Sequence, residues 1–253
     1  MSQINFDVLI VGAGVAGATL ACALGNQDLR VGLIDRAARP EWPEGSDIPG
    51  NIEYDARVSA INIASQRTLA ALGAWDAILE RRHQPFHAMR VWDEAGDAAT
   101  YFDATTIGEC AFGTIAENRV ATRALLDRAS QFDNISLHFE SQLTAIHGHA
   151  DHVELTLASG QTMRTRLLTG ADGGRSYVRQ QTDIQMPFKD YQQRTLVGTV
   201  RTENDHENTA WQRFLATGPC ALLPLAPNVC SLAWHADVPV SYTHLTLPTT
   251  PYV

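Results

Sequence analysis

The stretch FDVLIVGAGVAG, at residues 6–17, decides the fold that this sequence can adopt. Its first half is a nearly continuous apolar run rich in β-branched residues, which is typical of a parallel strand covered on both faces. A glycine turn follows, and the small residues AGATLACAL at 16–24 predict a tightly packed helix. The apolar run RVGLID at 30–35 is a second strand, so the sequence predicts a β-α-β unit with parallel strands.

The glycines of this turn fit the pattern G-x-G-x-x-G, in which each position has its own role. Gly12 permits the tight turn, Gly14 lets a diphosphate approach the backbone, and Gly17 lets the helix pack against the strand. The N–H groups and the dipole at the start of the helix attract phosphates. Asp35 lies 18 residues after Gly17, where an acid accepts hydrogen bonds from the adenosine ribose, and Arg36 follows it. We therefore predict a dinucleotide site, although the motif alone does not separate FAD from NAD.

A second glycine turn, LTGADGGRS at 168–176, follows another predicted strand and contains the pair Asp172-Gly173. An Asp-Gly turn alone is common on protein surfaces, so the pair gains meaning only together with the first motif. Elsewhere the hydrophobic periodicity predicts helices at 65–72 and 120–129, and strands that include 89–92, 100–102, 136–140, 153–157, 196–200 and 231–234. This order predicts an α/β protein, in which a mostly antiparallel layer is inserted into a nucleotide-binding domain.

The composition is that of an ordinary globular protein, because 45% of the 253 residues are apolar and 19% are charged. The net charge of -9 argues against nucleic-acid binding and against broad docking on anionic lipid, but it leaves room for a peripheral membrane contact. We predict no signal peptide and no transmembrane segment, because glycines break the first apolar run and no run approaches ~20 residues. The four cysteines form no C-x-x-C pair, which disfavours zinc or dithiol sites and suits a reducing cytoplasm.

Three histidines, His147, His149 and His152, cluster in the run HGHADH. Alternation along a strand would place His147 and His149 on one face, as a metal site needs. Gly148 and Asp151 mark a turn, however, so we favour a solvated loop and name no metal ligand. No Ser/His/Asp arrangement has supporting context either, so we name no catalytic side chain.

Together, these motifs resemble those of the class A FAD-dependent aromatic hydroxylases, the flavoprotein group that includes para-hydroxybenzoate hydroxylase. More specifically, the sequence is similar to the ubiquinone-biosynthesis hydroxylases from about residue 6 to about residue 234. The segments that carry this similarity are RVSAINIAS at 57–65, LGAW at 72–75, ENRV at 117–120, GADG at 170–173, WQRF at 211–214 and LPL at 223–225.

The resemblance implies a Rossmann-type FAD-binding domain with a parallel sheet, interleaved with a mostly antiparallel β-sheet substrate domain. The FAD-binding domain would comprise 1–85 and 114–180, and the incomplete substrate domain would comprise 86–113 and 181–240. The composition shifts abruptly at 241–253, so we predict a non-native tail there, with a flexible C-terminal tail as the alternative. The implied cofactor residues are Gly12, Gly14, Gly17, Asp35, Arg36, Arg57, Asn118, Asp172 and Gly173. The guanidinium of Arg57 suits phosphate oxygens, with a surface arginine as the alternative, and Asn118 also suits an N-cap.

The activity that the resemblance implies is a monooxygenation. NAD(P)H reduces the FAD, and dioxygen supplies a hydroxyl group to the ring of a polyprenylated phenol or quinol in ubiquinone biosynthesis. Other ubiquinone-biosynthesis proteins are the implied partners, at the cytoplasmic side of the inner membrane. Family members continue past residue 253 with a Gly-Asp-Ala-Ala-His segment, so we expect this chain to be an N-terminal fragment. The alternatives are a prenyl reductase or oxidase of the same fold, a nicotinamide dehydrogenase, and a non-catalytic nucleotide-binding module.

Overall fold

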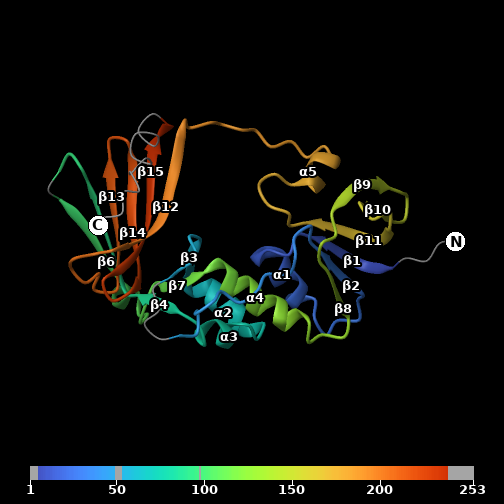
Figure 1. Ribbon diagram of the computed structural model, residues 1–253, viewed down its shortest axis with the longest axis horizontal. Coiled ribbons are helices and arrows are strands. Elements are labelled where there is room, and N and C mark those ends of the chain that lie inside the picture. Colours follow the sequence, from blue (N-terminus) through green and yellow to red (C-terminus); the bar gives the residue numbers. More distant parts are fainter. Residues whose placement is uncertain (1–4, 49–52, 97, 239–253) are drawn as a thin grey trace, which may run out of the picture. The chain divides into compact units, whose positions relative to one another are not determined.

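The computed structural model describes residues 5–48, 53–96 and 98–238, and the chain divides into two compact units (Figure 1). Unit 1 comprises Met1–Glu44, Arg67–Arg81 and Asn118–Pro187, and unit 2 comprises Gly45–Gln66, Arg82–Glu117 and Phe188–Val253. The domain boundaries predicted from the sequence stay predictions, and the predicted tail at 241–253 lies outside the described residues. Among the residues described, every helix is too short or too polar to cross a bilayer.

Unit 1 is built on a six-stranded sheet with the strand order β8-β2-β1-β11-β10-β9. Its strands are β1 (Phe6–Val11), β2 (Val31–Ile34), β8 (Ile135–His138), β9 (Leu143–Gly148), β10 (Val153–Leu157) and β11 (Thr162–Gly170). The strands β8, β2, β1 and β11 run parallel, whereas β10 and β9 add an antiparallel hairpin at one edge. The predicted parallel β-α-β unit is confirmed, because β1 pairs with β2 from Val8 opposite Val31 to Val11 opposite Ile34.

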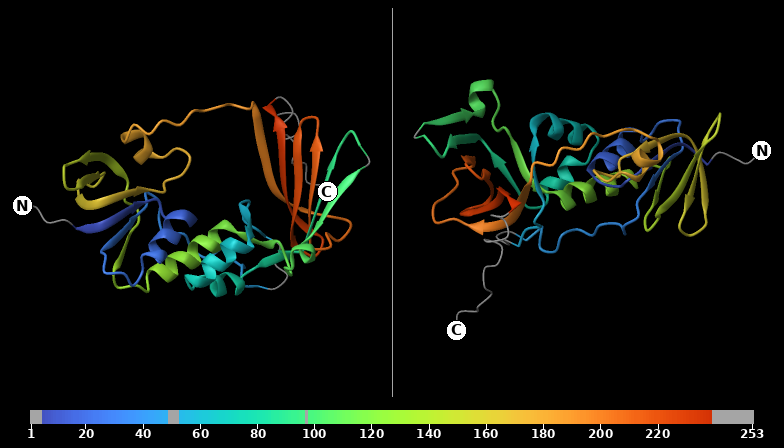
Figure 2. Two further views of the ribbon diagram at one scale, coloured as in Figure 1. Left: turned by 180° about the vertical axis from the view of Figure 1, so that it is seen from behind. Right: turned by 90° about the horizontal axis from the view of Figure 1, so that it is seen from above.

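The described helices are α1 (Val15–Ala23), α2 (Ile63–Ala71), α3 (Trp75–Leu79), α4 (Asn118–Ala129), α5 (Tyr177–Gln181) and the 3-10 helix η1 (Ala104–Ile107). Helix α1 packs against β1 and β2 and lies beside α4, as both views of Figure 2 show. The predicted apolar face of α4 is confirmed, since Val120, Ala124 and Leu125 are all buried. The thiol of Cys22 on α1 donates a hydrogen bond to the carbonyl oxygen of Leu125 on α4, at 3.2 Å.

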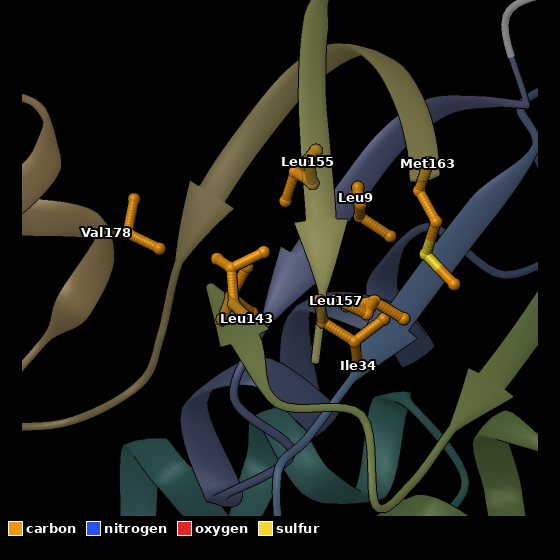
Figure 3. Close-up of a cluster of buried hydrophobic side chains, with 8 residues drawn as sticks. Leu9, Ile34, Leu143, Leu155, Leu157, Met163 and Val178 are labelled. Atoms are coloured by element: carbon orange, nitrogen blue, oxygen red, sulfur yellow. The ribbon is translucent and has the colours of Figure 1, made fainter. Parts of the chain in front are cut away.

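Eight buried apolar side chains fill the space on one side of the unit 1 sheet (Figure 3). They are Leu9, Val11, Ile34, Leu143, Leu155, Leu157, Met163 and Val178. Leu9, Ile34 and Leu155 are completely inaccessible to solvent, and burying a side chain of this size stabilises the fold by roughly 1.5–3 kcal/mol. This cluster therefore ties the β9–β10 hairpin to the parallel strands, which fixes the edge of the sheet beside the glycine turn.

Unit 2 contains a six-stranded sheet with the order β12-β15-β14-β13-β5-β6 and a three-stranded sheet with the order β3-β7-β4. The strands are β3 (Val58–Asn62), β4 (His83–Phe86), β5 (Ala88–Asp93), β6 (Ala99–Asp103), β7 (Gly113–Glu117), β12 (Gln193–Arg201), β13 (Thr209–Leu215), β14 (Gly218–Ala226) and β15 (Val229–Asp237). Neighbouring strands run antiparallel except for β13 and β5, which run parallel. The expected α/β fold with a mostly antiparallel second layer is thus confirmed.

Candidate cofactor site

The three glycines of the first turn are required for three different geometric reasons. Gly12 has a φ of +105°, which side-chain-bearing residues rarely adopt, and a Cβ there would lie 2.4 Å from the carbonyl oxygen of Ala171. A Cβ on Gly17 would lie 1.9 Å from the carbonyl oxygen of Gly12, so only glycine lets α1 pack this closely. A Cβ on Gly14, in contrast, would meet no described atom within 4 Å. Open space therefore adjoins the backbone at the position where the motif predicts a diphosphate.

Helix α1 starts at this open space. Its N-cap is Gly14, which has an extended backbone and offers no side chain to the first N–H groups of the helix. The first turn of α1 also contains no acidic residue. The N–H groups and the positive end of the helix dipole are therefore suited to an anionic group from outside the chain.

A pocket of about 760 Å³ opens in unit 1, where the parallel strands β1, β2 and β11 end. Ligands of open α/β sheets bind outside the carboxyl ends of such strands. Six of the residues predicted from the sequence line this pocket, namely Gly12, Gly14, Asp35, Arg36, Asp172 and Gly173. Both glycine turns and the acid after β2 thus come together at one site, although they are far apart in the sequence.

The carboxylate of Asp35 links the ends of β1 and β2. It accepts a hydrogen bond from the N–H of Ala13 at 2.7 Å and another from the N–H of Ala37 at 2.8 Å. Asp35 is half-buried and lines the pocket. Each carboxylate oxygen has a second lone pair, so Asp35 is still able to accept hydrogen bonds from sugar hydroxyl groups.

The carboxylate of Asp172 mainly organises the second glycine turn. It accepts hydrogen bonds from the Ser176 hydroxyl at 2.5 Å and from the N–H groups of Tyr177 at 2.6 Å and Val178 at 3.2 Å. Ser176 in turn caps α5 by accepting from the N–H of Arg179. Asp172 therefore holds the start of α5 beside the pocket, and its predicted direct role with the cofactor stays a prediction.

Nine further residues line the pocket that the sequence did not assign to it, namely Val11, Ala37, Ser141, Gln142, Leu143, Ala171, Gly174, Arg175 and Tyr177. Ser141 reaches the site because its N–H donates to the carbonyl oxygen of Asp35 at 2.8 Å. No motif marks this pairing, since it joins segments more than a hundred residues apart. The sequence indicated Arg175 only as a member of the second glycine turn and predicted no separate role for its guanidinium.

The remaining predicted residues lie outside the pocket lining. Gly17 is inside α1, Asn118 is the first residue of α4, and Arg57 precedes β3 in unit 2. The N–H of Arg57 donates to the carboxylate of Asp55 at 3.1 Å, which shapes the chain just before β3. Their predicted roles with the cofactor stay predictions.

Sequence reasoning also missed a buried ion pair in unit 2. The guanidinium of Arg82 lies 2.9 Å from the carboxylate of Glu117, and only 7% and 0% of the two side chains are exposed. Glu117 accepts from the N–H of Asp55 at 2.8 Å, and Arg82 donates to the carbonyl oxygen of Glu53 at 2.6 Å. Arg82 also lies over the ring of Tyr54, and burial raises the pKa of the Tyr54 hydroxyl. The ion pair therefore fixes the segment that leads to Arg57.

Comparison with known sequences identifies the relatives of this chain. The model of the FAD binding domain family matches residues 5–224. The chain is 39% identical to the ubiquinone hydroxylase UbiL of Rhodospirillum rubrum, over 90% of this chain and 51% of that protein. It is 34% identical to the 3-demethoxyubiquinol 3-hydroxylase of Escherichia coli, over 90% of this chain and 57% of that protein. The chain thus spans about half the length of the curated relatives it matches.

Solved structures show the same fold. The chain resembles PqsL of Pseudomonas aeruginosa with a TM-score of 0.78 and 23% identity, covering 95% of this chain and 63% of that chain. It also resembles the p-nitrophenol 4-monooxygenase PnpA of Pseudomonas putida, with a TM-score of 0.72, 13% identity, and 97% and 60% coverage. At these identities the likeness concerns the fold alone. The match to the family model over most of the sequence, together with the glycine turns at the pocket, shows that this chain belongs to the FAD binding domain family, and its relatives include ubiquinone-biosynthesis hydroxylases.

Proposed function

We propose that the pocket of unit 1 binds the adenosine diphosphate half of FAD. The observation that carries this proposal is the open space beside Gly14, at the uncapped start of α1 and within one pocket with Asp35. The N–H groups of α1 would donate to the diphosphate, and Asp35 would accept from the ribose hydroxyl groups. The cationic side chains of Arg36 and Arg175, which also line the pocket, would offset the phosphate charge.

Binding of FAD to this chain tests the first step. The chain is mixed with excess FAD and passed through gel filtration, and flavin absorbance is measured in the protein fraction. We expect flavin to elute with the chain, and less of it with Asp35→Asn, in which one carboxylate oxygen becomes an amide donor facing N–H groups. A chain that is folded by circular dichroism but elutes without flavin, and gains no thermal stability from FAD, contradicts the proposal.

We further propose that the whole protein hydroxylates the ring of a polyprenylated phenol or quinol, with NAD(P)H as the electron donor and dioxygen as the oxygen source. When bound, FAD supplies the redox chemistry of this reaction. The support is the sequence similarity to the ubiquinone hydroxylase UbiL and to the 3-demethoxyubiquinol 3-hydroxylase. The role of this chain would be to hold and orient the cofactor, with Arg57 and Asn118 contacting its remaining parts.

The reaction is tested on the whole protein, supplied with FAD, NADH or NADPH, and a short-chain prenylated phenol. Mass spectrometry of the product is expected to show the gain of one oxygen atom, derived from labelled dioxygen. Reduction of the prenyl chain without a new hydroxyl group would support the alternative FAD oxidoreductase. Flavin binding without any NAD(P)H oxidation would support the non-catalytic module.

A further inference from the structure

The hairpin of β9 and β10 carries three histidines and a glutamate on one face. The N–H of His149 donates to the carbonyl oxygen of His152 at 2.8 Å and closes a turn of two residues. In the paired strands next to this turn, His147 on β9 lies directly opposite Glu154 on β10. Because side chains alternate between faces, these four residues share the face that points away from the buried Leu155. The sequence alone favoured a solvated loop for this run, but it did not reveal the cross-strand pairing.

The pairing brings possible ligand atoms close together. One ligand atom each from His149, His152 and Glu154 lies within 4.8 Å of the others. The rings of His149 and His152 are stacked, with their centroids 4.4 Å apart and their planes at 10°. In a tetrahedral site with bonds of about 2.0–2.1 Å, ligand atoms are about 3.3 Å apart, so rotations of these side chains would complete the site without backbone movement.

A second observation shows which ring nitrogen of His152 is available to bind a metal. Its Nδ1 lies 2.7 Å from the carboxylate of Asp151. A carboxylate only accepts hydrogen bonds, so Nδ1 carries a proton here, and in the neutral imidazole Nε2 then has the lone pair that a metal requires. Histidine ligands of metals commonly donate their second ring N–H to a carboxylate in this way. Asp151 thus orients His152 as a ligand.

Glu154 also keeps one carboxylate oxygen available to a metal. The guanidinium of Arg164 contacts only its Oε2, at 2.7 Å from Nε and 2.6 Å from the terminal nitrogen. Among the described residues, Oε1 of Glu154 therefore remains available to a metal. The positive charge of Arg164 is more than balanced by the carboxylates of Asp151 and Glu154, so the local charge is negative and suits a cation.

We propose that this hairpin binds one divalent transition-metal ion through His149, Nε2 of His152 and Glu154. Two imidazoles and a carboxylate favour zinc, nickel or copper over magnesium or calcium. The site lies at the far end of β9 from Leu143, which lines the cofactor pocket, and six strand residues span roughly 20 Å. The metal would cross-link the two sides of the hairpin at the sheet edge, independently of the proposed flavin binding.

Zinc titration by calorimetry tests this site on the chelator-treated chain. We expect saturable binding of one zinc ion, and a loss of affinity of more than about 100-fold in the double variant His149→Ala/His152→Ala. Asp151→Asn keeps all three ligands but loses the orienting carboxylate, so its affinity is expected to fall about 10- to 100-fold, as for other outer partners of metal ligands. The control His235→Ala, on β15 in unit 2, is expected to bind zinc like the unmodified chain.

The result does not depend on a variant that fails to fold. Circular dichroism without zinc should give the same melting temperature for every variant used, and Glu154→Gln replaces the double variant if that one unfolds. Zinc binding by the ligand variant that is as tight as binding by the unmodified chain, or no saturable binding by the unmodified chain, overturns the proposal. Flavin binding is measured in parallel, so failure of the metal site is distinguished from failure of the cofactor site.

Discussion

At the scale of single residues, substitutions at Gly14 and Gly17 are expected to distinguish an effect on cofactor binding from an effect on folding. Both belong to the same turn, but a Cβ on Gly14 would enter open space, whereas a Cβ on Gly17 would collide with the carbonyl oxygen of Gly12. The backbone of Gly14 is extended, with φ of -70°, so alanine is tolerated there without strain. The two substitutions therefore form a matched pair with opposite expected effects.

We expect Gly14→Ala to keep the melting temperature and to weaken FAD binding by about tenfold or more, which corresponds to about 1.4 kcal/mol. The methyl group would occupy the space proposed for the diphosphate. Gly17→Ala is expected to lower the free energy of unfolding by about 1–3 kcal/mol or more, because α1 must move away from the turn. Urea unfolding and flavin fluorescence titration measure the two effects. If Gly14→Ala bound FAD normally, the diphosphate would have to lie elsewhere.

The buried ion pair of Arg82 and Glu117 gives a second prediction at this scale. Glu117→Ala leaves the guanidinium of Arg82 buried without its counter-charge, so we expect the free energy of unfolding to fall by about 3–5 kcal/mol in urea titrations. Asp127→Ala is the control. Asp127 pairs with Arg39 and Arg123, but one third of its side chain is exposed, so its loss should cost about 0–1 kcal/mol. If both substitutions lowered the free energy of unfolding equally, Glu117 would not hold the segment before Arg57.

At the scale of secondary-structure elements, a protonated thiol links α1 to α4. Burial raises the pKa of Cys22 from 9.0 to about 11, and Cys22 donates to the carbonyl oxygen of Leu125. A raised pKa means that the folded chain holds the proton more tightly than the unfolded chain does. The resulting stability is complete below about pH 9 and is lost as the pH rises towards 11.

We therefore expect the free energy of unfolding to fall less steeply between pH 9 and 11 in Cys22→Ala than in the unmodified chain. Urea midpoints measured at several pH values in this window give the slope. Burial also raises the pKa of Cys230 to about 11, so the free energy of unfolding of Cys22→Ala should still fall in part over this pH window. Cys110 is exposed, so Cys110→Ala should leave the slope unchanged. A slope that is identical in all three proteins contradicts the role given to the Cys22 thiol.

Elements with a strong periodic pattern were predictable from the sequence. The strands around the first glycine turn and the helix α4 appear within about two residues of their predicted ends, because burial and periodicity coincide there. The strand β4 was missed because it contains Pro85, which lacks the N–H that a central strand needs. Proline is tolerated there because β4 is an edge strand of the β3-β7-β4 sheet.

The candidate site was predictable only where a local motif marks it. Gly12, Gly14 and Asp35 follow from strand, turn and spacing, and the structure places them in one pocket. Ser141 and Gln142 carry no motif, and they reach the pocket only because Ser141 bonds to the end of β2. Such contacts depend on which strands become neighbours, and periodicity does not specify this.

At the scale of the whole molecule, the chain passes between the two units repeatedly, since each unit is made of three separate stretches. The last passage joins α5 to β12 and contains exposed apolar side chains, among them Phe188 and Tyr191, with 82% and 71% exposed. We expect brief chymotrypsin treatment to cut the chain there first, because exposed backbone outside helices and strands is the preferred site of proteolysis. A denaturing gel should then show two fragments.

The two fragments are expected to stay together under native conditions and to elute from gel filtration as one peak. Strand β13 would lie in the second fragment and β5 in the first, yet they pair in parallel through six residue pairs from Thr209 opposite Ala88 to Phe214 opposite Asp93. Substituting both aromatic residues, in Phe188→Ser/Tyr191→Ser, should slow the cut without changing the melting temperature, because neither side chain is buried. Fragments that separate without denaturant would show that the β13–β5 pairing does not hold the second sheet together. First cleavage within a strand would instead show that the α5–β12 connection is protected.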